Sequence, residues 1–162
     1  MKIVVTGGVG FIGTNTCIEA VGRGHEVVAF DNLVRPLTEK NIELLKNQGV
    51  KIVRGDVRDA VDYDKLPWIP DAFIHLAGQC GIPYAQISPR YDFEVNVLGT
   101  INVLEYARNH GKLPVAFASS NKAYTNITND WPIKETETRY EWKYVPHLYA
   151  GERGIAENLP LD

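Results

Sequence analysis

The stretch that decides the fold is Thr-Gly-Gly-Val-Gly-Phe-Ile-Gly, residues 6–13. It follows an apolar run, residues 2–6, that is typical of a short buried strand. It leads into residues 11–21, where apolar side chains recur at helical spacing. Two glycine fingerprints fit the turn, G-x-x-G-x-x-G and G-x-G-x-x-G, and they differ only in their first position: Gly7 or Gly8, followed by Gly10 and Gly13. A strand, a glycine-rich turn and a helix in this order predict the first unit of a parallel α/β fold.

The alternation of short apolar runs and helix-like segments continues beyond this unit. Further strands are predicted at residues 26–30, 51–54, 72–77 and 115–118, and further helices at residues 38–48 and 91–109. Thr38 is placed to cap the first of these helices. The second carries an apolar stripe, widened by Leu98, that consists of Phe93, Val97, Ile101 and Leu104. The pattern predicts an α/β fold: a doubly wound, Rossmann-type parallel sheet with helices on both faces.

Composition excludes several classes of protein. The chain has 162 residues and a net charge of -3 without a basic stripe, which argues against a nucleic-acid partner. No apolar run approaches the roughly 20 residues that cross a membrane, and the N-terminus does not read as a signal peptide. Cys17 and Cys80 lie in unlike contexts, and the four histidines show no metal-ligand spacing, so we expect no disulfide framework and no metal. We expect a cytoplasmic protein.

The glycine-rich turn suits one kind of ligand, a dinucleotide. Without a Cβ the backbone can turn sharply and approach a pyrophosphate, and the following helix offers free N–H groups to it. Asp31 lies eighteen residues past Gly13, at the end of the second strand. A carboxylate there accepts both ribose hydroxyls and repels a 2′-phosphate, which favours NAD over NADP. The alternative is a turn that serves packing alone, with Asp31 as a solvated acid.

Two further segments belong to the same edge of the predicted sheet. Asp56 and Val57 follow the third strand, where they can meet the adenine edge. Residues 76–79 follow the fourth strand, where small side chains let a cofactor lie along the backbone. For Asp56, a turn-forming acid after Gly55 is the alternative.

Several motifs together resemble the extended short-chain dehydrogenase/reductase family of NAD-dependent sugar-nucleotide epimerases and dehydratases. Besides residues 6–13, they are Phe-Asp-Asn-Leu at 30–33, Gly-Asp-Val-Arg-Asp at 55–59, His-Leu-Ala-Gly-Gln at 75–79, Asn-Val-Leu-Gly-Thr-Ile-Asn-Val-Leu-Glu at 96–105 and Ala-Ser-Ser-Asn-Lys-Ala-Tyr at 118–124. The stretch Ser-Ser-Asn-Lys-Ala-Tyr at 119–124, followed by those at 137–141 and 159–162, looks most like the CDP-tyvelose/CDP-paratose 2-epimerase branch. The resemblance implies that NAD is held by Gly7, Gly10, Phe11, Ile12, Gly13, Asp31, Asn32, Asp56, Val57, Leu76, Ala77, Gly78, Gln79, Asn96 and Ser119.

The resemblance also implies a reaction on a nucleotide sugar, with a CDP-sugar favoured. Bound NAD takes a hydride from a sugar carbon while a tyrosinate removes the hydroxyl proton, and the hydride then returns to the keto sugar. Ser120 matches the hydroxyl that hydrogen-bonds the reacting oxygen, with a polar strand end as the alternative. For Asn96 the alternative is a polar packing residue. Asn121 and Lys122 stand where sugar 4,6-dehydratases place an Asp-Glu pair, so dehydration is disfavoured.

The expected catalytic tyrosine is missing from its motif. The family uses Tyr-x-x-x-Lys, and this sequence offers only Tyr149-Ala-Gly-Glu-Arg153, in which arginine replaces lysine. We therefore expect Tyr149 to be a loop aromatic, with a catalytic base as the less favoured alternative. The chain then reads as the N-terminal part of a longer enzyme, inactive on its own and truncated after the fifth strand and an irregular segment.

This interpretation gives two regions. Residues 1–124 are the NAD-binding Rossmann domain, and residues 125–162 are an incomplete, irregular aromatic and acidic insertion at the active site, with the C-terminal substrate region absent. The family commonly forms homodimers through the helix at 91–109 and a later helix, so a dimer is expected of the full-length protein. An inactive NAD-binding module and a dehydratase or reductase of the same family are the alternative functions.

Overall fold

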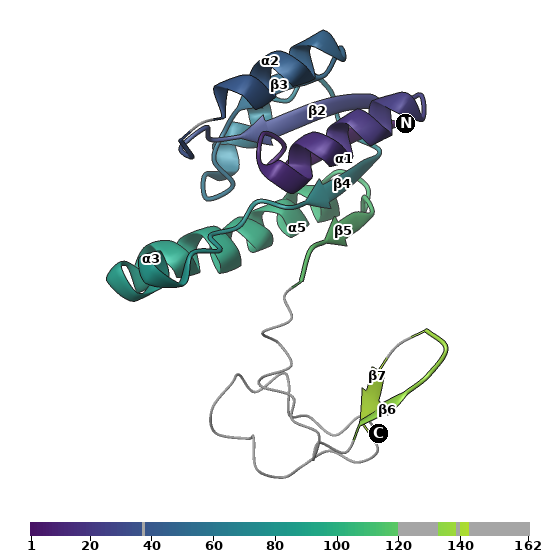
Figure 1. The fold of residues 1–162 in the computed structure, drawn as a ribbon. Coiled ribbons are helices and arrows are strands. Elements are labelled where there is room, and N and C mark those ends of the chain that lie inside the picture. Colours follow the sequence, from purple (N-terminus) through teal and green to yellow (C-terminus); the bar gives the residue numbers. More distant parts are fainter. Residues whose placement is uncertain (37, 120–132, 139, 143–162) are drawn as a thin grey trace. The chain divides into compact units, whose positions relative to one another are not determined.

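The computed structural model of the chain contains two units, Met1–Ala118 and Ser119–Asp162, and describes residues 1–36, 38–119, 133–138 and 140–142. The first unit holds a five-stranded sheet in which all neighbouring strands are parallel, in the order β3-β2-β1-β4-β5 (Figure 1). The strands are β1 (Lys2–Thr6), β2 (Glu26–Asp31), β3 (Lys51–Arg54), β4 (Ala72–His75) and β5 (Val115–Phe117). The predicted doubly wound parallel sheet is confirmed. Its order reverses between β1 and β4, and such a switch point is where this kind of sheet binds ligands.

Helices cover both faces of the sheet because the central strands are apolar on both sides. On one face, Ile3 and Val5 of β1 share a buried cluster with residues of α1 (Phe11–Gly22) and α2 (Glu39–Asn47). On the other face, Val4 shares a cluster with residues of the 3-10 turn η1 (Ala60–Lys65) and of α5 (Gly99–Asn109). Alternate side chains of one strand thus enter two separate cores, as a strand covered on both faces requires.

The helix predicted at 91–109 is interrupted. It follows α3 (Ile82–Ile87) and consists of α4 (Pro89–Phe93), a π-helical turn η2 (Glu94–Leu98) and α5. In the π turn the Gly99 N–H donates to the carbonyl of Glu94, five residues back. Such turns occur mostly within α-helices and often at functional sites.

The apolar stripe of this helix is not its buried face. Val95, Val103 and Ala107 are buried on the sheet. The stripe itself, which we call the α5 stripe, is 58%, 43%, 48% and 49% exposed at Phe93, Val97, Ile101 and Leu104. Helical periodicity therefore identified an amphipathic segment without showing which of its two apolar sides meets the sheet.

The predicted cap on α2 is wrong. Thr38 stands at the N-cap position, but its side chain caps no helix N–H, and its hydroxyl donates to the Arg35 carbonyl at 3.2 Å. Its backbone is helical (φ -85°, ψ -9°). An N-cap residue usually has an extended backbone, which brings its side-chain oxygen to the first helical N–H groups.

The second unit contains strands that the sequence pattern did not predict. β6 (Ile133–Glu135) and β7 (Tyr140–Trp142) form an antiparallel pair in which Ile133 lies opposite Trp142. Three residues per strand are too few for a readable alternation. Across the described parts of both units, we find no helix with the length and apolar character needed to span a membrane.

Candidate functional site

The glycine-rich turn joins β1 to α1 at the carboxyl edge of the sheet. Gly7 has a φ of +66°, a left-handed conformation that glycine adopts without strain. A Cβ on Gly7 would lie 2.8 Å from the backbone nitrogen of Ala77, which follows β4. The Gly7 N–H donates to the Phe30 carbonyl of β2 at 2.8 Å. Gly7 thus lets the turn lie against β2 and the segment after β4. A Cβ on Gly8 would likewise lie 2.7 Å from Ala29 of β2, so the structure requires glycine at the first position of both fingerprints.

The other two glycines of the fingerprints differ in what surrounds them. A Cβ on Gly13 would lie 2.1 Å from the Gly7 carbonyl oxygen, so Gly13 lets α1 pack closely on the turn. A Cβ on Gly10 would meet only that same oxygen, at 3.2 Å, and nothing else within 4 Å. Gly10 precedes α1, whose first turn has neither a side-chain cap nor an acidic residue. The structure therefore leaves space beside Gly10 and helix N–H groups without a side-chain cap, which is the arrangement that favours anions at helix N-termini.

Asp31 at the end of β2 holds the turn from the other side. Its Oδ2 accepts the Val9 N–H at 3.1 Å, and its Oδ1 accepts the Leu33 N–H at 2.9 Å. Asn41 of α2 adds a bond of 2.8 Å from its side-chain nitrogen to the Val9 carbonyl. Each carboxylate oxygen has a second lone pair, so Asp31 can still accept two hydroxyls. Leu33 has a φ of +59°, an unusual value for a leucine, and its N–H is the one that bonds Asp31 Oδ1.

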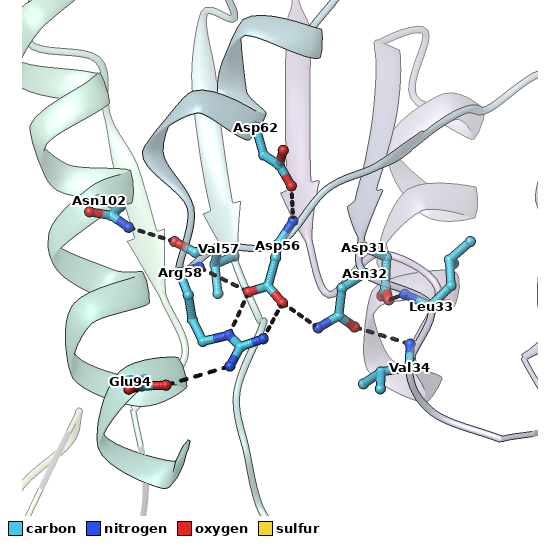
Figure 2. Close-up of polar contacts among 10 residues, drawn as sticks. All are labelled: Asp31, Asn32, Leu33, Val34, Asp56, Val57, Arg58, Asp62, Glu94 and Asn102. Carbon is cyan, nitrogen blue, oxygen red and sulfur yellow. Dashed lines mark hydrogen bonds and ion pairs between the residues drawn. The ribbon is translucent and has the colours of Figure 1, made fainter. Parts of the chain in front are cut away.

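Asp56, after β3, is the centre of a polar cluster (Figure 2). Its carboxylate accepts the Asn32 side-chain N–H at 3.0 Å and three bonds from Arg58, through the backbone N–H and both Nε and Nη2, at 2.8–3.0 Å. Burial acts to raise the pKa of Asp56, but the bonds from Arg58 and Asn32 outweigh it and lower the pKa to about 2. Asp56 is therefore ionised at neutral pH.

Arg58 connects this cluster to α4 and the π turn. Its guanidinium lies 4.7 Å from the ring centre of Tyr91. Its Nη1 lies 3.6 Å from a carboxylate oxygen of Glu94 in the π turn (Figure 2). The Val57 side chain is buried, and its carbonyl accepts the Asn102 side-chain N–H at 2.9 Å. Val57 can thus meet a ligand only through its backbone.

The segment after β4 is held by the π turn. Asn96 accepts the Gln79 N–H at 2.8 Å and donates to the Gln79 carbonyl at 3.0 Å, so its side-chain amide pairs with one backbone unit. The Gln79 side chain in turn bonds both backbone groups of Gly81. Gly78 is exposed, and a Cβ there would lie 3.3 Å from the Asn96 oxygen. Asn96 positions this loop, and its predicted contact with a cofactor stays a prediction.

The structure brings most of the predicted residues to one edge but gives some of them other surroundings. Phe11 and Ile12 are 84% and 64% exposed and line an open groove of about 650 Å³ that Ile74 of β4 and Asn15 of α1 also line. Ser119 is exposed and belongs to the second unit. The predicted catalytic candidates lie outside the described residues: Ser120 and Tyr149.

Sequence reasoning missed three side chains that organise the site. Arg58 and Asn41 act through the bonds described above, and their partners are 2 and 32 residues away. His75 is buried at the end of β4 between hydroxyls of two other elements. Local signals existed for two of them: Arg58 lies inside the segment Gly-Asp-Val-Arg-Asp, and His75 begins the segment His-Leu-Ala-Gly-Gln.

Comparison with known proteins adds the family. The sequence model of the NAD dependent epimerase/dehydratase family matches residues 3–153. The chain is 37% identical over 153 residues to a CDP-paratose 2-epimerase of Salmonella typhi. The aligned region covers 92% of this chain and 45% of that protein.

Solved structures agree. A UDP-glucose 4-epimerase of Thermus thermophilus in complex with NAD is similar with a TM-score of 0.64 and 35% identity, over 74% of this chain and 38% of that one. A UDP-glucose 4-epimerase of Stenotrophomonas maltophila, with bound NAD and formylated UDP-arabinopyranose, is similar with a TM-score of 0.68 and 30% identity, over 78% and 39%. The chain thus spans less than half the length of each of these three proteins.

Proposed function

The chain belongs to the NAD dependent epimerase/dehydratase family, and from this premise we propose that its first unit is the NAD-binding part of a sugar-nucleotide epimerase. NAD is the cofactor of the family. The observation that carries the proposal is the space beside Gly10 at the N-terminus of α1, which has no side-chain cap. Bound there, NAD would supply a reversible hydride acceptor; the residues of the chain bind and orient it.

Most of the predicted residues of the first unit have a role in this proposal. The N–H groups at the start of α1, those of Phe11, Ile12 and Gly13, face the pyrophosphate, and Asp31 accepts the ribose hydroxyls with Asn32 beside it. The adenine ring meets Asp56 and the Val57 backbone, and the rest of the cofactor passes the loop after β4: Leu76, Ala77, Gly78 and Gln79. Ser119 belongs to the second unit, and its predicted contact with the cofactor stays a prediction.

NAD, rather than NADP, follows from the charge of Asp31. A 2′-phosphate would lie against a carboxylate whose two oxygens already hold the Val9 and Leu33 N–H groups, so the carboxylate cannot turn away without releasing the turn. Calorimetric titration of the purified chain tests this: we expect NAD to bind and NADP to bind at least tenfold more weakly. The absence of any heat with NAD from folded protein would refute the proposal.

The reaction we propose is epimerisation of a nucleotide sugar, with a CDP-sugar favoured. It is supported by the similarity to a CDP-paratose 2-epimerase and by Asn121-Lys122 in place of a dehydratase Asp-Glu pair. Ser120 would hydrogen-bond the reacting sugar oxygen. Assays of CDP-, UDP- and GDP-sugars on a protein that includes Tyr-x-x-x-Lys would separate epimerase, dehydratase and reductase.

We further propose that residues 1–162 alone turn over no nucleotide sugar. The support is the sequence of these residues, which holds Tyr149-Ala-Gly-Glu-Arg153 but no Tyr-x-x-x-Lys. The same observation favours a second candidate function, an NAD-binding module without catalysis. Steady epimerisation by the 162-residue chain that is lost in Tyr149→Phe would contradict both proposals.

Two proposals concern the surroundings of the protein. The exposed α5 stripe suits the homodimer that the family commonly forms, and Ile101→Lys, at a half-exposed position, should then shift the dimer toward monomer in sedimentation experiments. Cys17 and Cys80 are free thiols and Cys80 is exposed, which supports a reducing, cytoplasmic location.

A further inference from the structure

His75 is a buried imidazole with a hydroxyl on each side. It ends β4 and is 1% exposed. Its Nδ1 lies 2.6 Å from the Thr6 hydroxyl of β1, and its Nε2 lies 3.0 Å from the Thr100 hydroxyl of α5. Burial lowers the pKa of His75 to about 4, so the ring is neutral at pH 7 and carries a single N–H.

The neighbours of the two hydroxyls decide which nitrogen carries that proton. The Thr100 hydroxyl lies 2.7 Å from the backbone carbonyl oxygen of Asn96. A carbonyl oxygen can only accept a hydrogen bond, so Thr100 donates to it. The oxygen of Thr100 must then accept from Nε2–H of His75. Nδ1 is consequently an acceptor, and the Thr6 hydroxyl donates to it while its own oxygen accepts the Ala77 N–H at 3.3 Å.

All of these bonds run in one direction. Ala77 N–H donates to Thr6, Thr6 to His75, His75 to Thr100 and Thr100 to the Asn96 carbonyl. The Asn96 side chain closes the connection, because it pairs with the backbone of Gln79, two residues beyond Ala77. The chain of bonds therefore begins and ends at the loop after β4.

We propose that His75, as the neutral Nε2–H tautomer, is a positioning residue that fixes the loop Leu76–Gln79 against the glycine-rich turn through this one-way chain of hydrogen bonds. The position of the loop matters because the backbone of Ala77 packs directly against Gly7: a Cβ on Gly7 would lie 2.8 Å from the Ala77 nitrogen. His75 touches no ligand itself. The inference rests on the proposed function in one respect, namely that NAD passes along this loop.

Substitution of Thr100 is the best test of the proposal. Its hydroxyl belongs to the series of hydrogen bonds through His75, but Thr100 lies on α5, outside the glycine-rich turn and the loop after β4. Thr100→Val keeps the shape but leaves Nε2–H of a buried ring without an acceptor, and Thr100→Ser restores the hydroxyl. Thr16→Val is the matched control, since Thr16 of α1 also donates to a carbonyl four residues back, that of Ile12, at 3.0 Å.

The first measurement is the tautomer, by long-range ¹H–¹⁵N NMR of the His75 ring in the 162-residue chain. We expect a protonated Nε2 and an unprotonated Nδ1 in the unaltered chain, in Thr100→Ser and in Thr16→Val, and a changed tautomer signal in Thr100→Val. A protonated Nδ1 in the unaltered chain would overturn the inference, whether or not NAD binds.

The second measurement is NAD affinity by calorimetry, well below the unfolding temperature of each variant. We expect Thr100→Val to weaken binding roughly fivefold to twentyfold, and Thr100→Ser and Thr16→Val to stay within about twofold. Unchanged affinity in folded Thr100→Val would refute a positioning role. If the unaltered chain binds no NAD, the proposed function fails. The inference is then decided by the His75 tautomer and by hydrogen exchange, which we expect to be faster at the Ala77 N–H in Thr100→Val.

Discussion

Three glycine-to-alanine substitutions can separate the ligand site from the packing of the fold. At Gly10 the backbone has φ -70° and ψ 174°, which alanine adopts freely, and the added Cβ would meet only one atom, at 3.2 Å. A shift of a few tenths of an ångström relieves this contact, so Gly10→Ala should lower the free energy of unfolding by less than about 1 kcal/mol. The same methyl group occupies the space that we assign to the pyrophosphate, so NAD affinity should fall at least tenfold.

The other two positions give opposite results. In Gly13→Ala the Cβ would lie 2.1 Å from the Gly7 carbonyl oxygen and 2.7 Å from the Gly8 Cα, so α1 must move off the turn. We expect a loss of about 1–3 kcal/mol in stability. Gly22, at the end of α1, has nothing within 4 Å of its Cβ position, so Gly22→Ala should be neutral or stabilise the fold by up to about 1 kcal/mol.

Urea unfolding and calorimetric titration with NAD, applied to all three variants, check this reasoning. The expected pattern is a binding defect without a folding defect for Gly10→Ala, a folding defect for Gly13→Ala and neither for Gly22→Ala. If Gly10→Ala bound NAD as tightly as the unaltered chain, the pyrophosphate would not lie at the start of α1, and the site would have to be placed elsewhere.

Further predictions concern stability and selectivity. Tyr63 is buried with an unpartnered hydroxyl, so Tyr63→Phe should leave stability unchanged or raise it by about 1 kcal/mol in urea unfolding; a clear loss would reveal a partner for the hydroxyl. The folded-state pKa of His75, about 4, lies below the ordinary value of 6.5, so the unfolded chain binds this proton first as the pH falls. Stability contributed by neutral His75 is complete above about pH 6.5 and should decline by about 3 kcal/mol toward pH 4, a slope that urea unfolding of His75→Gln should lack. Asp31→Asn should reduce the preference for NAD over NADP at least tenfold in calorimetry, because the negative charge beside the 2′ position is gone; an unchanged ratio would assign selectivity to another group.

Much of this fold is readable from the sequence because its signals are local. The apolar run before Gly7 predicts β1, which ends where the run ends. The spacing of Cys17 and Ala20 predicts α1, and each of these patterns involves only a few neighbouring residues. Asp31 was found because it stands at the end of the strand after the glycine-rich turn. Its bond to Val9 confirms that it lies beside that turn.

The remaining features depend on contacts between distant parts of the chain. The site role of His75 comes from Thr6 and Thr100, which are 69 and 25 residues away, so no window of sequence contains the interaction. The α5 stripe illustrates a different limit. Helical periodicity reports that apolar residues share a side, but only tertiary packing shows that Val103 and its neighbours face the sheet instead. The β6 and β7 strands were missed because they are short.

The π turn has an evolutionary consequence. In this turn an N–H bonds a carbonyl five residues back instead of four, so the turn accommodates one residue more than a regular α-helical turn while the helix continues on either side. Deletion of a single codon between Glu94 and Leu98 would restore regular winding and remove the local widening that presents Asn96 to the loop after β4. Substitutions at neighbouring exposed positions carry no such effect. Among natural homologues, we therefore expect this segment to vary in residue type far more readily than in length.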